Sequence, residues 1–103
     1  MSTYDEHTEV HITALYTQTA RKTTFNTSLS RIVLQIVEEA YEKLGEHRRA
    51  DDQYFCHQEP RVDLTPYLQR TLHALEREGV CLHDNHGKLA FAFDIEAKPG
   101  GAA

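Results

Sequence analysis

The sequence predicts a small α+β domain in the order strand, long helix, short helix, helix, hairpin, with a small antiparallel sheet. Three patterns support this order: alternating apolar residues near the N-terminus, a wide helical apolar stripe, and a capped helix that runs into a two-faced hairpin. The 103 residues suffice for one hydrophobic core and not for two. We therefore expect a single domain over residues 1–95, with residues 1–7 frayed and residues 96–103 forming a flexible tail.

The first strand is predicted by apolar residues two positions apart, with polar residues between them. The apolar members are Val10, Ile12 and Ala14. The alternation extends to about Thr17. Residues 18–27 are polar, rich in threonine and aperiodic, and we interpret them as a loop or an extended edge anchored by Phe25.

The long helix is predicted by a stripe of apolar residues with spacings of three and four. Its members are Leu29, Ile32, Val33, Ile36, Val37, Ala40, Tyr41 and Leu44. Thr27 or Ser28 can cap the free N–H groups at its start, and Gly45 supplies the left-handed residue that ends such a helix. A stripe this wide must be buried in the core or in a dimer interface.

Two further helices are predicted. Ala50 to His57 is interpreted as a short helix that ends before Pro60, because the residue before a proline disfavours helical geometry. The next helix begins with a Thr65 cap and with Pro66 at the first helical position, and Gly79 ends it.

The hairpin follows, with the turn placed at Asp84 to Gly87. In this register His83 faces Lys88, Leu82 faces Leu89 and Val80 faces Phe91. One side of the hairpin is apolar and holds Val80, Leu82, Leu89, Phe91, Phe93 and Ile95. The other side is small or polar and holds Cys81, His83, Lys88, Ala90, Ala92 and Asp94. A slip of one residue would bury the polar set, so we expect this register to be well specified.

Residues 28–95 resemble the winged helix-turn-helix superfamily, and the phrase LHALEREGVCLHDNHGKLAFAF resembles its recognition helix and wing. The resemblance implies a winged-helix-like domain whose third helix and wing tip face a partner. The contact residues it implies are Gln69, Arg70, His73, Arg77, His86 and Lys88. The chain departs from the pattern in two ways: Glu76 and Glu78 lie on the third helix, and the strand between the first two helices is not evident.

The charge balance decides between partners. A net charge of −5 is unlike the basic footprint expected of a protein that binds nucleic acid through its electrostatic field. We therefore favour a small non-enzymatic binding module that acts through protein–protein contacts, as an adaptor, inhibitor or regulator. A winged-helix DNA-binding regulator is the alternative, with Gln69 and Arg70 reading base edges.

A metal-binding regulatory protein is the second alternative. The chain has seven histidines, and Cys81, His83 and His86 form a C-x-H-x-x-H pattern to which Cys56 could add a ligand. Tetrahedral zinc sites use paired spacings such as C-x-x-C, so the simpler interpretation is a small cysteine beside surface histidines. No cofactor is expected.

No catalytic motif and no small-molecule site stand out, so we expect no enzyme. The sequence has no apolar run of membrane length and no signal peptide, which predicts a cytoplasmic protein with reduced Cys56 and Cys81.

Self-association or a protein partner is suggested by the small side of the hairpin, at Ala90 and Ala92. The first strand either covers this side or leaves it as an interface. An exposed strand edge is a second route to a dimer, by pairing across a two-fold axis.

Overall fold

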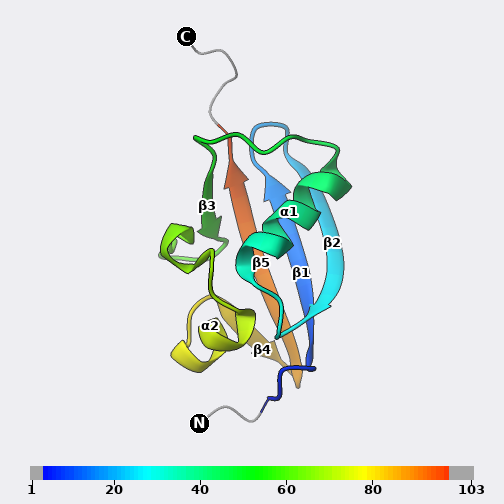
Figure 1. Ribbon diagram of the computed structural model, residues 1–103, viewed down its shortest axis with the longest axis vertical. Helices are drawn as coiled ribbons and strands as arrows, with labels where there is room; N and C mark the ends of the chain where they lie inside the picture. Colours follow the sequence, from blue (N-terminus) through cyan, green and yellow to red (C-terminus); the bar gives the residue numbers. More distant parts are fainter. Residues whose placement is uncertain (1–3, 98–103) are drawn as a thin grey trace.

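The computed structural model describes residues 4–97 and contains one mixed sheet of five strands (Figure 1). The strands are β1 (Glu9–Tyr16), β2 (Arg21–Ser28), β3 (Gln53–Cys56), β4 (Leu82–Asn85) and β5 (Lys88–Glu96). Their order is β2-β1-β5-β3, and β4 pairs with β5 beyond the end of β3, along the same edge of β5. β1 and β5 are parallel, whereas β2, β3 and β4 are antiparallel to their neighbours.

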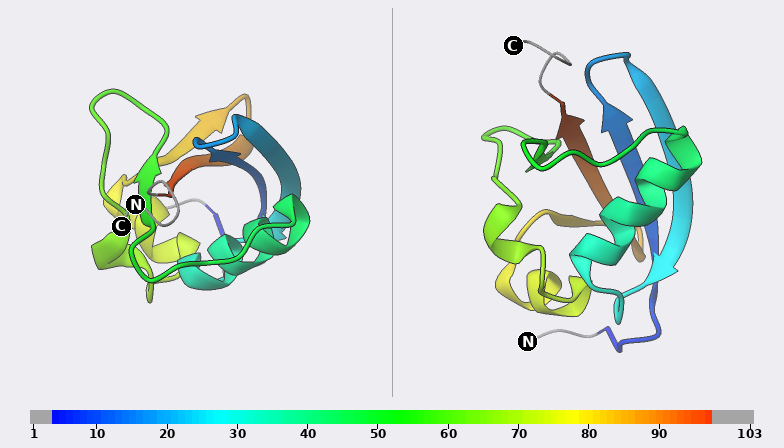
Figure 2. Two further views of the ribbon diagram at one scale, coloured as in Figure 1. Left: turned by 90° about the horizontal axis from the view of Figure 1, so that it is seen from above. Right: turned by 45° about the horizontal axis from the view of Figure 1, so that its top comes forward.

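Two α-helices, α1 (Val33–Leu44) and α2 (Leu72–Glu78), pack on one face of this sheet (Figure 2). A short 3-10 turn, η1 (Thr65–Tyr67), precedes α2. The fold is therefore α+β, with two parallel strands at the centre of the sheet and α1 packed across them. Within residues 4–97, no helix lies on the opposite face of the sheet (Figure 2).

The core lies between the sheet and the helices. Every second residue of β1 points to the helices and pairs with a residue of β5 that does the same, as Ile12 does with Phe91. The buried set on these two strands is Val10, Ile12, Ala14, Tyr16, Leu89, Phe91, Phe93 and Ile95. The stripe on α1 covers it with Val33, Ile36, Val37, Ala40, Tyr41 and Leu44, as the helical spacing predicts.

The winged helix-turn-helix prediction is wrong. It required three helices and a small antiparallel sheet, whereas the described residues form two α-helices and a mixed sheet of five strands. The predicted N-terminal strand is present as β1, but it pairs in parallel with β5 within the same chain. Residues 18–27, interpreted as a loop or an extended edge, contain most of the edge strand β2. Residues assigned to a short helix supply β3.

The long helix is shorter than predicted at its start. α1 begins at Val33, and the expected caps at Thr27 and Ser28 belong to β2. The backbone N–H of Leu29 donates to the Thr8 carbonyl at 3.1 Å, so the β1–β2 hairpin continues one residue further. Leu29 is therefore buried from a loop, which its apolar character could not distinguish from a helical position.

The predicted helix over residues 65–79 is interrupted because two of its backbone carbonyls accept hydrogen bonds from the first turn of α1. The Val33 N–H donates to the Arg70 carbonyl and the Leu34 N–H donates to the Leu68 carbonyl, each at 2.9 Å. These bonds satisfy free N–H groups in the first turn of α1. The two carbonyls then accept from α1, and the segment forms η1 and α2 in place of one helix.

The residues predicted to start and end this helix are confirmed only in part. Pro66 lies in η1, where its missing N–H costs nothing. α2 is capped by Thr71, whose hydroxyl oxygen accepts from the Ala74 N–H at 3.1 Å. Gly79 ends it with a φ of 72°, as predicted.

The predicted short helix over Ala50–His57 is also wrong. β3 pairs antiparallel with the C-terminal half of β5, placing Tyr54 opposite Ile95. Tyr54 and Cys56 are buried while Phe55 between them is half-buried, so the residues alternate as in a strand.

The hairpin is confirmed with a register shifted by two residues. Its turn is His86-Gly87, both with positive φ (56° and 83°), as in the tight turns that connect hairpin strands. Leu82 therefore faces Phe91 rather than Leu89. A shift of two residues preserves the faces, so the apolar and the small or polar sides of β5 are as predicted.

The predicted reduced cysteines are joined in a disulfide. Cys56 ends β3 and Cys81 precedes β4, and their Cα atoms lie 5.8 Å apart. The bond links two short strands that follow one another along the same edge of β5. It closes the segment that carries η1 and α2.

A buried polar network connects the end of α1 to β3. The Tyr41 hydroxyl donates to an Asp52 carboxylate oxygen and lies 3.1 Å from the Tyr54 hydroxyl. The Arg49 N–H donates to the same carboxylate oxygen at 3.1 Å. Burial, reinforced by these hydrogen bonds, raises the pKa of Tyr41 well above its usual range, so the phenol stays protonated and holds the carboxylate.

The disulfide should contribute measurably to stability. Cys56 and Cys81 are 25 residues apart, and closing a loop of that size stabilises a domain by about 3 kcal/mol in the chain-entropy estimate. We expect dithiothreitol to lower the free energy of unfolding in urea by about 2–4 kcal/mol.

The double variant Cys56→Ser, Cys81→Ser is the control, since it should match the reduced protein and be insensitive to reductant. Two thiols that react in the native protein without any reductant would contradict the bond.

Candidate functional site

The candidate site is the face of the sheet opposite the helices, called here the open face (Figure 2). No described helix lies over it. Its centre is made of small side chains, because Thr13 of β1 pairs with Ala92 of β5 and Ala90 lies two residues away. All three are half-buried. The rim carries Leu15, Lys22, Phe55, His57, His83 and Lys88.

A carboxylate lies inside this face. Asp94 alternates with the apolar residues of β5 and is only 8% exposed. Its oxygens lie 2.9 Å and 3.2 Å from Nδ1 of His57. The backbone N–H of His57 also donates to the Ala92 carbonyl at 3.0 Å, which continues the edge of the sheet beyond β3. His57 is thus held in place through both its imidazole ring and its backbone N–H.

Two hollows meet at this pair. One hollow is lined mainly by residues of β1, β2 and β5 and has a volume of about 320 Å³. Its walls are Thr13, Leu15, Lys22, His57, Ala92, Phe93 and Asp94. The other, of about 360 Å³, is lined by His57, Gln58, Glu59, Arg61 and Asp94. The guanidinium of Arg61 lies 3.9 Å from the centre of the Phe55 ring, which forms the rim there.

A third hollow of about 470 Å³ lies at the other end of the open face. It includes Lys88 and His11, and a ring nitrogen of His11 lies 3.0 Å from the Asn26 side-chain oxygen. Beyond it, the hydroxyl of Tyr4 and the Gly87 N–H hydrogen-bond to Asp84 and hold the pKa of that carboxyl below its usual value.

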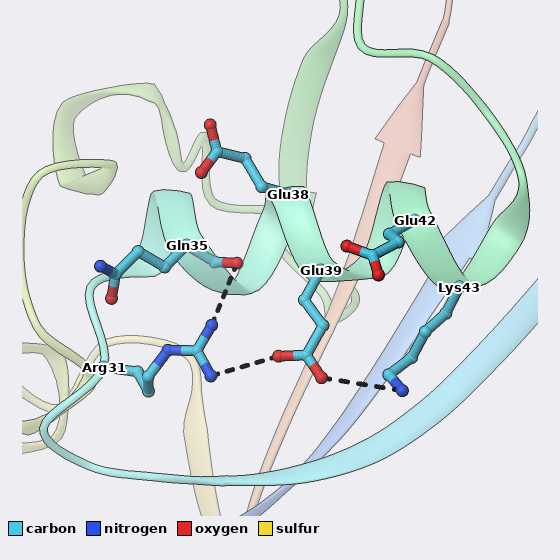
Figure 3. A pocket seen from close by; sticks show the side chains of 6 residues that line it. All are labelled: Arg31, Gln35, Glu38, Glu39, Glu42 and Lys43. Carbon is cyan, nitrogen blue, oxygen red and sulfur yellow. Dashed lines mark hydrogen bonds and ion pairs between the residues drawn. The ribbon is translucent and has the colours of Figure 1, made fainter.

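The hollow on the other side of the molecule is a charged helix surface (Figure 3). It is lined by Arg31, Gln35, Glu38, Glu39, Glu42 and Lys43. Arg31 and Lys43 pair with the same carboxylate, Glu39, at 3.1 Å and 3.8 Å. Ion pairs that remain partly exposed to solvent contribute little energy, so this hollow is a solvated surface.

The contact residues implied for the third helix do not form one helical row. Gln69 and Arg70 precede α2, and Arg70 forms an ion pair with Glu78. His73 is half-buried and Arg77 is exposed within α2. The expected i, i+3, i+7 alignment required one continuous helix from Arg70 to Arg77. Arg70 lies before α2, and its carbonyl accepts a hydrogen bond from the Val33 N–H of α1.

The two predicted residues of the wing tip lie at the β4–β5 turn. His86 and Lys88 are exposed there, and Lys88 lines the hollow on the open face. α2 packs on the opposite face of the sheet (Figure 2). The implied helix contacts and Lys88 therefore belong to different faces.

The predicted metal ligands are not brought together as thiolates and imidazoles. Cys56 and Cys81 are bonded to each other, and His83 and His86 are exposed on the hairpin. Within residues 4–97, no three residues of the metal-ligating types are grouped around a point that could hold an ion.

The pairing of His57 with Asp94 was missed from the sequence. The signal available was a single acidic residue within an apolar alternation, AFAFDI, where a charged side chain needs a partner when buried. Nothing in the sequence identified that partner, which is 37 residues away.

No protein-family model matches the sequence, and no curated protein matches it either. A bilayer span needs about 20 residues. The longest helix in the described part of the chain, α1, has 12, and none there is long and apolar enough to cross a membrane.

The His57–Asp94 pair makes a prediction about stability. His57→Ala removes the imidazole partner of a carboxylate that is 8% exposed, so we expect the free energy of unfolding to fall by about 1–2 kcal/mol. The matched variant His83→Ala, exposed on the same face, should change it by about 0.5 kcal/mol or less.

Urea denaturation followed by circular dichroism measures both variants. Equal midpoints for the two would show that the pair contributes nothing to the fold.

Proposed function

We propose that this protein is a non-enzymatic binding module that contacts a protein partner through the open face of its sheet. The observation that carries the proposal is the helix-free face centred on Thr13, Ala90 and Ala92. Small residues on a pleated surface let another layer approach closely, and the polar rim around them gives directional contacts.

The surroundings of the centre support a polypeptide partner. Half-buried apolar side chains, Leu15 and Phe55, lie on either side of Asp94, next to the small centre. The hollow beside His57 and Lys22 can receive one side chain of the partner. A patch that combines apolar anchors with hydrogen-bonding groups in shallow hollows is the usual anatomy of a protein contact.

Charge supports protein over DNA. The net charge of −5 is unfavourable for a phosphate backbone. On the open face, three cations, Lys22, Lys88 and Arg61, lie among three carboxylates, Glu9, Asp94 and Glu96. The DNA-binding alternative relied on a continuous recognition helix, and α2 spans only Leu72–Glu78.

A catalytic role has less support. The His57–Asp94 pair could orient an imidazole as a base, but general-base chemistry needs a nucleophile or bound water in reach. The hydroxyl that lines the same hollow is that of Thr13, and both cysteines are held in the disulfide.

The cytoplasmic location expected from the sequence belongs to this proposal as well. The observation against it is the Cys56–Cys81 bond, because reducing systems keep most cytosolic cysteines as thiols. Alkylation of the protein during isolation tests this location. Free thiols at both cysteines would support the cytoplasm, and an intact disulfide would support an oxidising compartment.

A bulky charge at the centre of the open face should abolish binding. Ala92→Arg projects a long cation from the middle of the contact area, and we expect the partner captured by the wild-type protein to be lost. Ala50→Arg is the matched control, since it makes the same change at an exposed position between α1 and β3 and should retain the partner.

Quantitative mass spectrometry of the captured proteins makes the comparison, with circular dichroism to show that both variants fold. Retention of every captured protein by Ala92→Arg would overturn the assignment of the open face. Loss on Arg77→Ala with retention on Ala92→Arg would move the contact to α2.

A further inference from the structure

The two outer edges of the sheet differ in how they are protected. On one side, β3 is covered by a following segment: Cys56 N–H donates to the Val62 carbonyl and Leu64 N–H to the Tyr54 carbonyl, both at 2.9 Å. β4, on the same side, has only four residues. On the other side, β2 has eight residues and, within the described part of the chain, pairs with β1 alone.

The β2 edge carries few of the features that prevent strand pairing. Edge strands are usually protected by proline, bulges, short length or charges along the strand. β2 has the sequence RKTTFNTS, without proline, and its two charged residues, Arg21 and Lys22, both lie at its start. The remaining six residues are neutral and include three threonines and Phe25.

We propose that β2 pairs antiparallel with β2 of a second copy of this chain, across a two-fold axis normal to the sheet. The two five-stranded sheets then form one continuous sheet, and the open faces of both copies lie on the same side. The contact is isologous, as in most homodimers. This pairing uses an edge of the sheet and does not depend on the partner proposed for the open face.

The position of the charges selects the antiparallel arrangement. A parallel pair in register would bring Lys22 next to Lys22 of the second copy, at the strand spacing of about 4.8 Å. An antiparallel pair centred on Thr24 places Lys22 opposite Asn26, so the two lysines lie about 13 Å apart along the strands. That separation exceeds the screening length of about 8 Å at physiological ionic strength.

Neighbouring registers that preserve the faces are similarly free of like charges. Centring the pair on Phe25 places Lys22 opposite Ser28 and Thr24 opposite Asn26. In this register Thr23 pairs with Thr27 of the second copy, and such cross-strand pairs favour strand association.

The helix surface beside β2 does not oppose a second copy by charge of a single sign. Arg31 hydrogen-bonds to Thr27 of β2, and the Lys43 ammonium lies 5.6 Å from the centre of the Phe25 ring. Both cations form ion pairs with Glu39 of α1, and Glu42 lies on the same helix surface (Figure 3). The charges next to the edge are therefore mixed.

Sedimentation equilibrium of the full chain over a concentration series tests the proposal. We expect the wild-type protein to form a reversible dimer, and the variant Thr24→Lys, Asn26→Lys to weaken its association constant at least tenfold. In every register centred on residues 24 to 26 this variant places lysines opposite one another, while both positions are exposed and outside the core.

The matched control is His83→Lys, Asn85→Lys, which adds the same charges at the same spacing on exposed positions of β4 and should leave association unchanged. A monomer at all concentrations, or equal association of the two variants, would overturn the proposal. Loss of association only in the β4 variant would overturn it too, since that result assigns the contact to the other edge.

A second variant keeps the test decisive should the lysine variant fold poorly. Thr24→Cys should form a covalent dimer with a short bis-maleimide cross-linker, because the two copies of residue 24 lie opposite or diagonal to each other across the axis. Asn85→Cys, on β4, should stay monomeric under the same conditions, and equal cross-linking of both would contradict the β2 contact.

Discussion

The fold depends on the parallel pairing of β1 with β5. These strands come from opposite ends of the described chain, and parallel neighbours require a long crossover, which here contains nearly everything else. Their helix-facing side chains, including Ile12 and Phe91, are completely buried and form the floor of the core. β2, β3 and β4 attach to this pair at its edges, and α1 closes the core above it.

The same register creates the open face. Residues of a strand alternate between faces, so burying Ile12 and Phe91 toward the helices places Thr13 and Ala92 together on the other side. The carboxylate of Asp94 follows on that side and is held by His57 from the end of β3. The open face is therefore a direct consequence of the pairing that forms the core.

Local signals in the sequence predicted local structure well. The alternation around Val10 to Ala14, the glycine stops at Gly45 and Gly79, and the small and polar side of β5 are all found in the structure. The winged-helix prediction failed because it needed pairings between distant residues. Neither the parallel alignment of β1 with β5 nor the bonds from α1 to the Leu68 and Arg70 carbonyls leave a local trace.

The candidate site likewise combines features that local sequence predicts with features that depend on contacts between distant residues. Alternation along the hairpin identified Ala90 and Ala92 as a small, flat side before any fold was known. Whether the first strand covers this side could not be decided from the sequence. In the structure β1 pairs beside β5 and does not pack over it. The partner of Asp94 and the bonding of Cys56 to Cys81 could not be foreseen, because β5 brings their segments together only after folding.

In the function proposed above, the open face binds the partner and the helix face does not. The most direct measurement is a titration of ¹⁵N-labelled protein with the captured partner, followed by the backbone amide shifts in heteronuclear NMR spectra. We predict that the largest changes fall on Thr13, Ala90, Ala92 and Asp94, with little change along the exposed side of α1. Changes concentrated on Gln35, Glu38 and Glu42, with the open face unperturbed, would contradict the account.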